Sequence, residues 1–172
     1  MATVRSETPE DVSEIRRVNE LAFGTPAEAR LVETLRDGGK AVLSLVAVED
    51  NRVVGHLLLS PVTIESGEPV DETFSALGLG PMAVLPEHQR RGIGSLLIES
   101  ALNTSRKAGH DCVVLVGHAE YYPRFGFVPA SRFGLQCQYD VPDEVFMAME
   151  LREGTLTRHK GMVRYQPEFD EV

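Results

Sequence analysis

Two arginines and two glycines stand between an apolar strand and a helix. The strand ends Met82-Ala83-Val84, and a few residues later the chain reads Gln89-Arg90-Arg91-Gly92-Ile93-Gly94-Ser95. The first N–H groups of a helix have no acceptor within the helix and carry a partial positive charge. Glycines let an anion come close to the main chain, and the two arginines add full positive charges. These residues predict a binding site for a phosphate or pyrophosphate group.

Two commoner phosphate-binding motifs do not fit this turn. A P-loop needs Gly-Lys-Ser/Thr, but the only Gly-Lys pair, Gly39-Lys40, is followed by Ala41. The dinucleotide fingerprint needs a third glycine three residues after the second, and Leu97 stands there, after Gly94. Neither motif accounts for the turn.

Two segments of the chain resemble one known family. The segment from Gln89 to Gly94 resembles the Gln/Arg-x-x-Gly-x-Gly/Ala signature of the GNAT superfamily of N-acetyltransferases, in which this turn binds the pyrophosphate of acetyl-CoA. Further on, Tyr121 to Phe127 is similar to the family's aromatic-Tyr-x-x-x-Gly-Phe segment, and it follows an apolar strand, Cys112 to Val116. The resemblance covers about residues 3 to 151. It points to a compact bacterial subset of unassigned substrate, because Gly117 to Glu120 stands where many members carry an Asn.

The resemblance implies an α/β (α+β) fold, the GNAT acyl-CoA N-acyltransferase fold. This fold has a mixed, mostly antiparallel central sheet with flanking helices and a splayed central pair of parallel strands. Pro81, which cannot donate a hydrogen bond within a sheet, is consistent with the splay. Alternatively, the strand begins only at Met82. The resemblance implies acetyl-CoA as the cosubstrate and places the following residues at the cofactor: Met82, Ala83, Val84, Gln89, Arg90, Arg91, Gly92, Ile93, Gly94 and Ser95. Nothing in the sequence suggests a metal.

A tyrosine is the candidate catalytic acid. Attack of an amine on a thioester expels a thiolate, whose thiol has a pKa of roughly 8.5 by analogy with cysteine. A tyrosine with a pKa of about 10 is protonated at neutral pH and can donate to that sulfur. The resemblance gives this role to Tyr122, with direct attack of the amine in a ternary complex. Alternatively, Tyr121 and Tyr122 only pack with Phe125 and Phe127.

The base is less well defined by the sequence. A lysine-like amine, with a pKa of about 10.4, is almost fully protonated at pH 7 and must lose a proton before it attacks. We place His118 first, because it follows an apolar strand and because histidine titrates near neutral pH. A structural hydrogen bond is the alternative role of His118, and a chain of waters is an alternative to any base. The other candidates are Glu120, Asp71 and Glu72.

Three functions fit these residues. We favour an acetyl-CoA-dependent N-acetyltransferase that acts on a primary amine of a small molecule or a protein. The alternative is an acetyl-CoA-binding regulatory or sensing module without turnover. A binding domain for another phosphorylated ligand would not explain the segment from Tyr121 to Phe127.

Composition limits the partners. The formal net charge of -9 argues against a nucleic-acid surface and favours a cationic amine, although acidic surfaces also keep proteins soluble. The N-terminus is charged and no apolar run is long enough to span a membrane, so we expect a cytoplasmic protein without membrane contact. Cys112 and Cys137 are too few for a disulfide framework or a cysteine metal site.

Caps and hydrophobic periodicity predict the elements that position these residues. One N-acetyltransferase domain is expected over residues 1–172, with a tail, 152–172, that packs loosely or reaches a partner subunit in a homodimer. Helices are predicted from Thr8, from Thr25 to Gly38 and from Gly94 to Lys107; a hairpin from Leu43 to Glu49 and Val53 to Ile64; a loop from Glu65 to Thr73; and a parallel pair of strands from Leu77 to Val84 and Cys112 to Val116.

Overall fold

Two compact units make up the structure, a computed structural model that describes residues Met1 to Val172. The first unit contains Met1–Ser60, Leu79–Ala101 and Pro167–Val172, and the second contains Pro61–Gly78 and Leu102–Gln166. The strands are β1 (Thr3–Ser6), β2 (Leu43–Glu49), β3 (Arg52–Glu65), β4 (Ala76–Val84), β5 (Cys112–Val116), β6 (Val128–Pro129), β7 (Leu135–Cys137), β8 (Phe146–Glu150) and β9 (Gly161–Arg164). The α-helices are α1 (Val12–Phe23), α2 (Ala27–Asp37) and α3 (Ile93–Lys107), and the 3-10 turns are η1 (Pro9–Asp11), η2 (Pro86–His88), η3 (Tyr122–Phe125), η4 (Ala130–Phe133), η5 (Asp143–Val145) and η6 (Pro167–Glu171). Strands β3 and β4 and helix α3 run from one unit into the other.

The predicted hairpin is confirmed in the first unit, where β1, β2 and β3 pair in antiparallel fashion. Leu43 at the start of β2 pairs with Leu59 of β3. The two strands are joined at Asp50 and Asn51, which both have positive φ. Two residues of this conformation match the right-handed twist of a hairpin, and Asp and Asn tolerate it better than most side chains.

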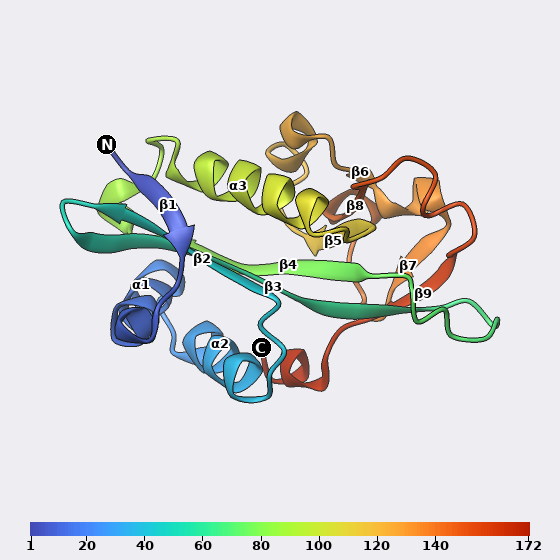
Figure 1. Ribbon diagram of the computed structural model, residues 1–172, viewed down its shortest axis with the longest axis horizontal. Helices are drawn as coiled ribbons and strands as arrows, with labels where there is room; N and C mark the ends of the chain where they lie inside the picture. Colours follow the sequence, from blue (N-terminus) through green and yellow to red (C-terminus); the bar gives the residue numbers. More distant parts are fainter. The chain divides into compact units, whose positions relative to one another are not determined.

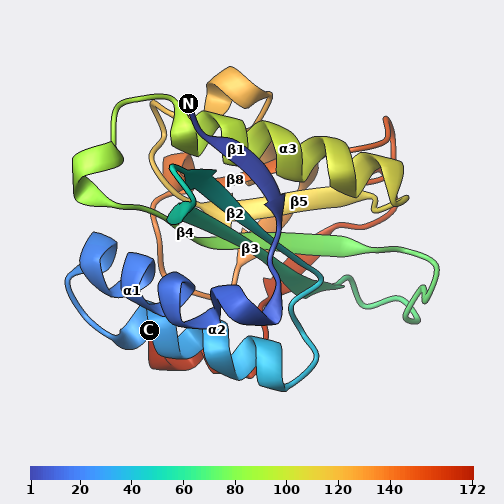
Figure 2. The same ribbon diagram turned by 60° about the vertical axis from the view of Figure 1, so that its left-hand side comes forward.

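Helices α1 and α2 lie side by side in the first unit, with η6 and the C-terminus next to α2 (Figures 1 and 2). The predicted start of the first helix is confirmed: the carboxylate of Asp11 accepts a hydrogen bond from the Thr8 N–H at 2.7 Å. The first turn is the 3-10 turn η1, and the α-helix begins at Val12. Lys40 Nζ lies 2.9 Å from a carboxylate oxygen of Glu168, which holds η6 close to the end of α2.

The predicted parallel pair is confirmed in the second unit. Ala76 to Gly78 of β4 pair with Cys112 to Val114 of β5. β8 pairs antiparallel with β5 and β6, while β9 pairs antiparallel with β3 and parallel with β7. Strand β4 continues through Pro81 to Val84, so the alternative of a strand that begins at Met82 is wrong. The fold is mixed α/β, with a mostly antiparallel open sheet, one central parallel pair and flanking helices.

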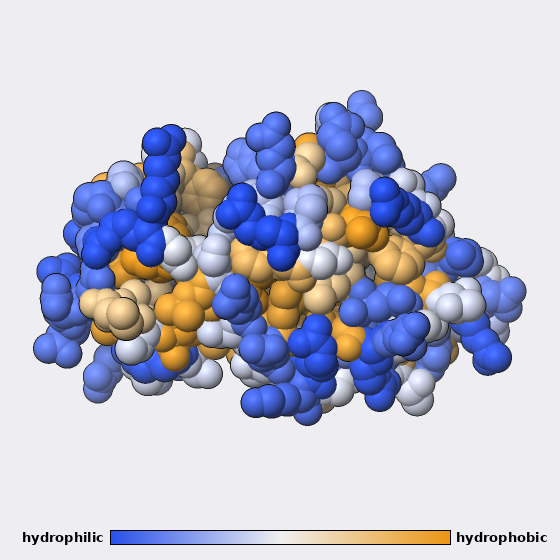
Figure 3. Space-filling view, turned by 90° about the horizontal axis from the view of Figure 1, so that it is seen from above, coloured by the Kyte–Doolittle hydropathy of each residue, from blue (hydrophilic) through white to orange (hydrophobic).

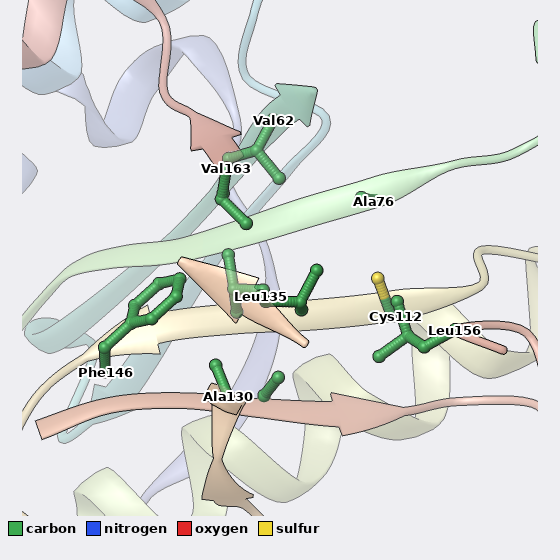
Figure 4. Packing of buried hydrophobic residues seen from close by; sticks show 10 residues of the cluster. Val62, Ala76, Cys112, Ala130, Leu135, Phe146, Leu156 and Val163 are labelled. Carbon is green, nitrogen blue, oxygen red and sulfur yellow. The ribbon is translucent and has the colours of Figure 1, made fainter. Parts of the chain in front are cut away.

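The core of the second unit includes residues from the predicted tail. Val163 of β9 is completely buried and packs with Val62, Leu135 and Phe146 (Figure 4). The expectation of a loosely packed tail is therefore wrong for these residues. The physical reason is that β9 is inserted between β3 and β7, where its backbone groups are paired on both sides.

Hydrophilic side chains cover much of the face seen in Figure 3, with hydrophobic side chains between them. None of the helices combines the length and the apolar character that a membrane-spanning helix needs.

Candidate active site

The basic turn between β4 and α3 is open around Gly92. Arg90 and Gly92 have positive φ angles of 63° and 82°. A side chain at Gly92 would be strained by this backbone, yet a Cβ there would meet no atom within 4 Å. The glycine is thus required by the path of the chain, and it leaves the approach to the start of α3 unobstructed.

Helix α3 presents its first N–H groups just after this glycine. The Gly92 carbonyl accepts the hydrogen bond of the Leu96 N–H at 3.0 Å, so the helical ladder starts here. The N–H groups of Ile93 and Gly94 precede the first intrahelical donors and can point to an anion. Ile93 and Leu97 pack on Gly55 of β3, where a Cβ would lie 3.2 and 3.1 Å from them. This close packing fixes the helix start against the sheet.

The two arginines of the turn differ in their surroundings. Arg91 Nη2 lies 3.2 Å from Glu49, and His88 Nε2 lies 3.3 Å from the other oxygen of the same carboxylate. Burial opposes the ionisation of Glu49, but the N-terminal amine and Arg91 outweigh it and lower the pKa of this carboxyl. Arg90 is exposed and has no ion pair. Its full charge is therefore available to a ligand, while that of Arg91 is partly compensated.

The residues predicted to bind the cofactor all lie in the first unit, between the last residues of β4 and the first turn of α3. Gln89 is tied to the end of β4, because its side-chain amide donates a hydrogen bond to the Val84 carbonyl at 2.9 Å. Ala83 is buried, whereas Met82 and Val84 are half-buried, and Ser95 is half-buried in the first turn of α3.

Tyr122 belongs to the second unit and begins the 3-10 turn η3 after β5. Tyr122 is 8% exposed. Its ring packs edge to face against the rings of Tyr121 and Phe127, with 5.2 and 6.0 Å between ring centroids. Burial, with a smaller contribution from Tyr121, raises the pKa of Tyr122 to about 12. The hydroxyl therefore keeps its proton throughout the neutral range.

Gly117 shapes the place that the Tyr122 ring occupies. A Cβ on Gly117 would lie 2.4 Å from Cε2 and 2.9 Å from Cδ2 of the ring, which is closer than non-bonded carbon atoms can approach. The Gly117 N–H donates to the Val145 carbonyl at 2.9 Å, so the backbone under the ring is itself fixed. Only glycine leaves room for Tyr122 in this position.

Backbone hydrogen bonds, not contacts of the side chain, hold His118 in position. Its carbonyl accepts hydrogen bonds from the N–H groups of Tyr121 and Tyr122 at 3.1 and 3.3 Å, while its side chain is exposed. Glu120 is exposed as well. Asp71 accepts hydrogen bonds from Thr73, which lower the pKa of its carboxyl and make it a weaker base.

The sequence does not indicate the structural roles of two residues, one beside the basic turn and one beside Tyr122. Glu49 ends an ordinary hairpin strand, and its contact with Arg91 joins segments far apart in the chain. Gly117 stands in the stretch that departs from the family motif, so its spacing from Tyr122 was the only signal available.

A fold of this kind, with a basic, glycine-containing turn at a helix start after a central strand, is typical of a class of acyltransferases, and comparisons with known proteins agree. The family model described as "Acetyltransferase (GNAT) domain" matches residues 3–130. The uncharacterized N-acetyltransferase YhbS of Escherichia coli is 30% identical over 168 residues, which cover 97% of this chain and 98% of YhbS. The uncharacterized N-acetyltransferase YjhQ of the same species is 38% identical over 157 residues, 87% of this chain and 85% of YjhQ.

Solved structures give the same result. The crystal structure of Escherichia coli YhbS in complex with CoA has a TM-score of 0.91 at 30% identity, and the match covers 98% of this chain and 92% of that one. A GNAT family acetyltransferase from Brucella melitensis in complex with acetyl-CoA has a TM-score of 0.79 at 35% identity, with 99% of each chain covered. The chain belongs to the GNAT family of acetyltransferases. It is an N-acetyltransferase, as the sequence predicted.

Proposed function

We propose that this enzyme transfers the acetyl group of acetyl-CoA to a primary amine, with Tyr122 as the general acid. The observation that carries the proposal is the buried ring of Tyr122, held against the backbone of Gly117 with its hydroxyl protonated. In this proposal, residues 1 to 172 form one N-acetyltransferase domain, which contains both the cofactor turn and Tyr122.

Acetyl-CoA is the acetyl donor. The relatives from Escherichia coli and Brucella melitensis bind CoA and acetyl-CoA, which supports this assignment. In this chain the N–H groups of Ile93 and Gly94, the open approach at Gly92 and the uncompensated charge of Arg90 suit a pyrophosphate. When bound, the cosubstrate supplies an activated acetyl thioester.

Tyr122 acts on the sulfur that leaves. The amine nitrogen forms a bond to the acetyl carbon while the carbon–sulfur bond breaks, and negative charge develops on sulfur. With a pKa of about 12 for Tyr122, complete proton transfer to a thiolate whose thiol has a pKa of roughly 8.5 is uphill. The hydroxyl therefore stabilises the sulfur chiefly through a hydrogen bond that strengthens as the charge grows.

The proton of the attacking amine goes to a base, for which we place His118 first. Its backbone is fixed by the two tyrosine N–H groups, and its exposed imidazole can exchange protons with water. An α-amine, with a pKa of about 8, needs this help much less than a lysine-like amine.

A panel of primary amines tests the proposal. The purified enzyme should bind acetyl-CoA in calorimetry, and it should release one free CoA thiol for each acetylated amine. Binding of acetyl-CoA without acetylation of any amine would favour the sensing module instead.

A further inference from the structure

A cavity of about 490 Å³ lies in the second unit, along β7 and the segment that joins β7 to β8. This volume is within the range of small-molecule sites, about 300 to 1,000 Å³. The residues of its wall that decide its chemistry are Leu135, Tyr139, Asp140, Val141, Asp143 and Phe146.

The cavity is joined to Tyr122 through the end of β5. Phe146, in the wall of the cavity, pairs with Val116, the last residue of β5. The next residue, Gly117, donates its N–H to the Val145 carbonyl at 2.9 Å and lies against the Tyr122 ring. One short stretch of backbone thus positions both the cavity wall and the proposed acid.

Part of the cavity wall is apolar, beside polar side chains such as Ser131 and Gln138. Leu135 and Phe146 are 2% and 4% exposed and belong to the core of the unit, as the sticks in Figure 4 show. Val141, which also lines the cavity, is half-buried. An alkyl chain can therefore be removed from water here, and each buried CH₂ favours binding by about 0.8 kcal/mol.

The rim of the cavity is negatively charged. Asp140 and Asp143 are exposed, and neither carboxylate forms an ion pair with the chain. No lysine, arginine or histidine lines the cavity. Two uncompensated carboxylates in the same cavity as Leu135, Val141 and Phe146 favour a ligand with an alkyl chain and a positive charge.

We propose that this cavity binds the acceptor, and that the acceptor is an alkyl diamine or polyamine without a carboxylate group. This inference rests on the proposed function. One neutral amine of the acceptor reacts: its nitrogen forms the amide bond, the carbon–sulfur bond breaks, and the spare amine proton goes to the base. The sulfur leaves as a thiolate that accepts a hydrogen bond from Tyr122 and then takes up a proton from water. The second, protonated amine is held by Asp140 and Asp143, with the alkyl chain on Phe146.

Three probes separate the features of such an acceptor. 1,5-Diaminopentane has the second charge, pentylamine lacks it, and free lysine adds a carboxylate to the diamine. In calorimetry with the CoA-saturated protein, 1,5-diaminopentane should bind about tenfold more tightly than pentylamine, and lysine should bind more weakly than the diamine. Equal affinities for 1,5-diaminopentane and pentylamine would overturn the inference.

Two matched variants test whether Asp140 and Asp143 cause the preference for the diamine. The double variant Asp140→Asn/Asp143→Asn should remove the preference for the diamine and leave the affinity for acetyl-CoA unchanged. The control is Glu144→Gln, an exposed acid next to Asp143 that does not line the cavity. An equal loss in the control would mean that only the general surface charge attracts the diamine, and the inference would be wrong.

The result also separates this inference from the proposed function. If amines are acetylated without any preference for the diamine, the acetyltransferase function stands and the acceptor class is wrong. If the diamine binds with the expected preference but is not acetylated while other amines are, the acceptor role of the cavity fails and the acetyltransferase function stands; if no amine is acetylated, the proposed function fails as well.

Discussion

The ring of Tyr122 rests on Gly117 so closely that a Cβ on the glycine would lie 2.4 Å from the ring carbon Cε2. The two residues form one structural feature: a fixed backbone carries a ring whose hydroxyl remains protonated. The hydroxyl of Tyr122 and the glycine at position 117 can be changed separately.

Tyr122→Phe keeps the ring and removes the proton that it can donate. We expect kcat to fall about 10²- to 10⁴-fold, the usual contribution of general acid catalysis. The affinity for acetyl-CoA and the melting temperature should stay near wild type, because the packing of the ring is unchanged. Steady-state kinetics and calorimetry measure these quantities. Tyr121→Phe is the packing control, and wild-type turnover in Tyr122→Phe would show that Tyr122 only packs.

Gly117→Ala leaves the hydroxyl in the protein and displaces it. Overpacking of this kind destabilises a protein by about 1 to 3 kcal/mol, and kcat should fall by more than about tenfold. The affinity for acetyl-CoA should change little, since the cofactor turn lies elsewhere in the chain. A thermal melt, kinetics and calorimetry give the three readouts.

A double-mutant cycle is the control for Gly117→Ala. If the glycine acts through the tyrosine, adding Gly117→Ala to Tyr122→Phe should cause almost no further loss of kcat. Two losses that multiply would mean that Gly117 supports activity by another route.

Gly92→Asp should weaken the binding of acetyl-CoA strongly. The backbone at this position has a φ of 82°, which strains most side chains, and a carboxylate adds negative charge at the proposed pyrophosphate site. Gly92→Asn has nearly the same shape without the charge, and Asn tolerates this conformation. The dissociation constant from calorimetry should rise at least about tenfold more for Asp than for Asn. Equal constants would place the anion elsewhere.

We expect the protein to lose stability in mild acid because of the buried side chain of His56. It is completely buried, with Nε2 2.8 Å from the Ser44 hydroxyl and Nδ1 3.4 Å from the Asn19 amide. Burial lowers its pKa from 6.5 to about 4. Between these two values the unfolded chain binds a proton that the folded protein does not, so the free energy of unfolding should fall as the pH drops from about 6.5 to about 4.

Urea titrations across this pH range measure the effect of His56. His56→Gln should be less stable at pH 7, since it disturbs a buried site, but its stability should depend less on pH in this window. An unchanged pH dependence in the variant would assign the titration to other groups.

Much of the fold could be predicted because its signals are local. The helix start at Thr8, the hairpin of Leu43 to Glu49 with Val53 to Ile64 and the strand from Cys112 to Val116 are each predicted from neighbouring residues, and each is confirmed. Strand β9 could not be predicted in this way. Its four residues have no strong periodicity, and they form a strand only because β3 and β7 offer unpaired edges.

The candidate site also shows that local features can be predicted from the sequence and long-range contacts cannot. The sequence located the turn from Gln89 to Ser95 and the segment with Tyr122, whose roles stay predictions. It did not indicate the contact of Glu49 with Arg91, because an ion pair between distant segments leaves no trace in a single sequence. The role of Gly117 was missed for a related reason: a close contact depends on the direction of a side chain, which spacing alone does not give.

The pairing of β9 with β3 sets a condition on how the chain folds during its synthesis. Ile64 of β3 pairs with Val163, so this strand is translated long before its partner. Until β9 leaves the ribosome, one edge of β3 and part of the core of the second unit stay open to water and to other chains. Long-range strand pairing forms slowly, and open strand edges aggregate. Nascent chains that stop before β9 should therefore be the form of this protein most dependent on chaperones.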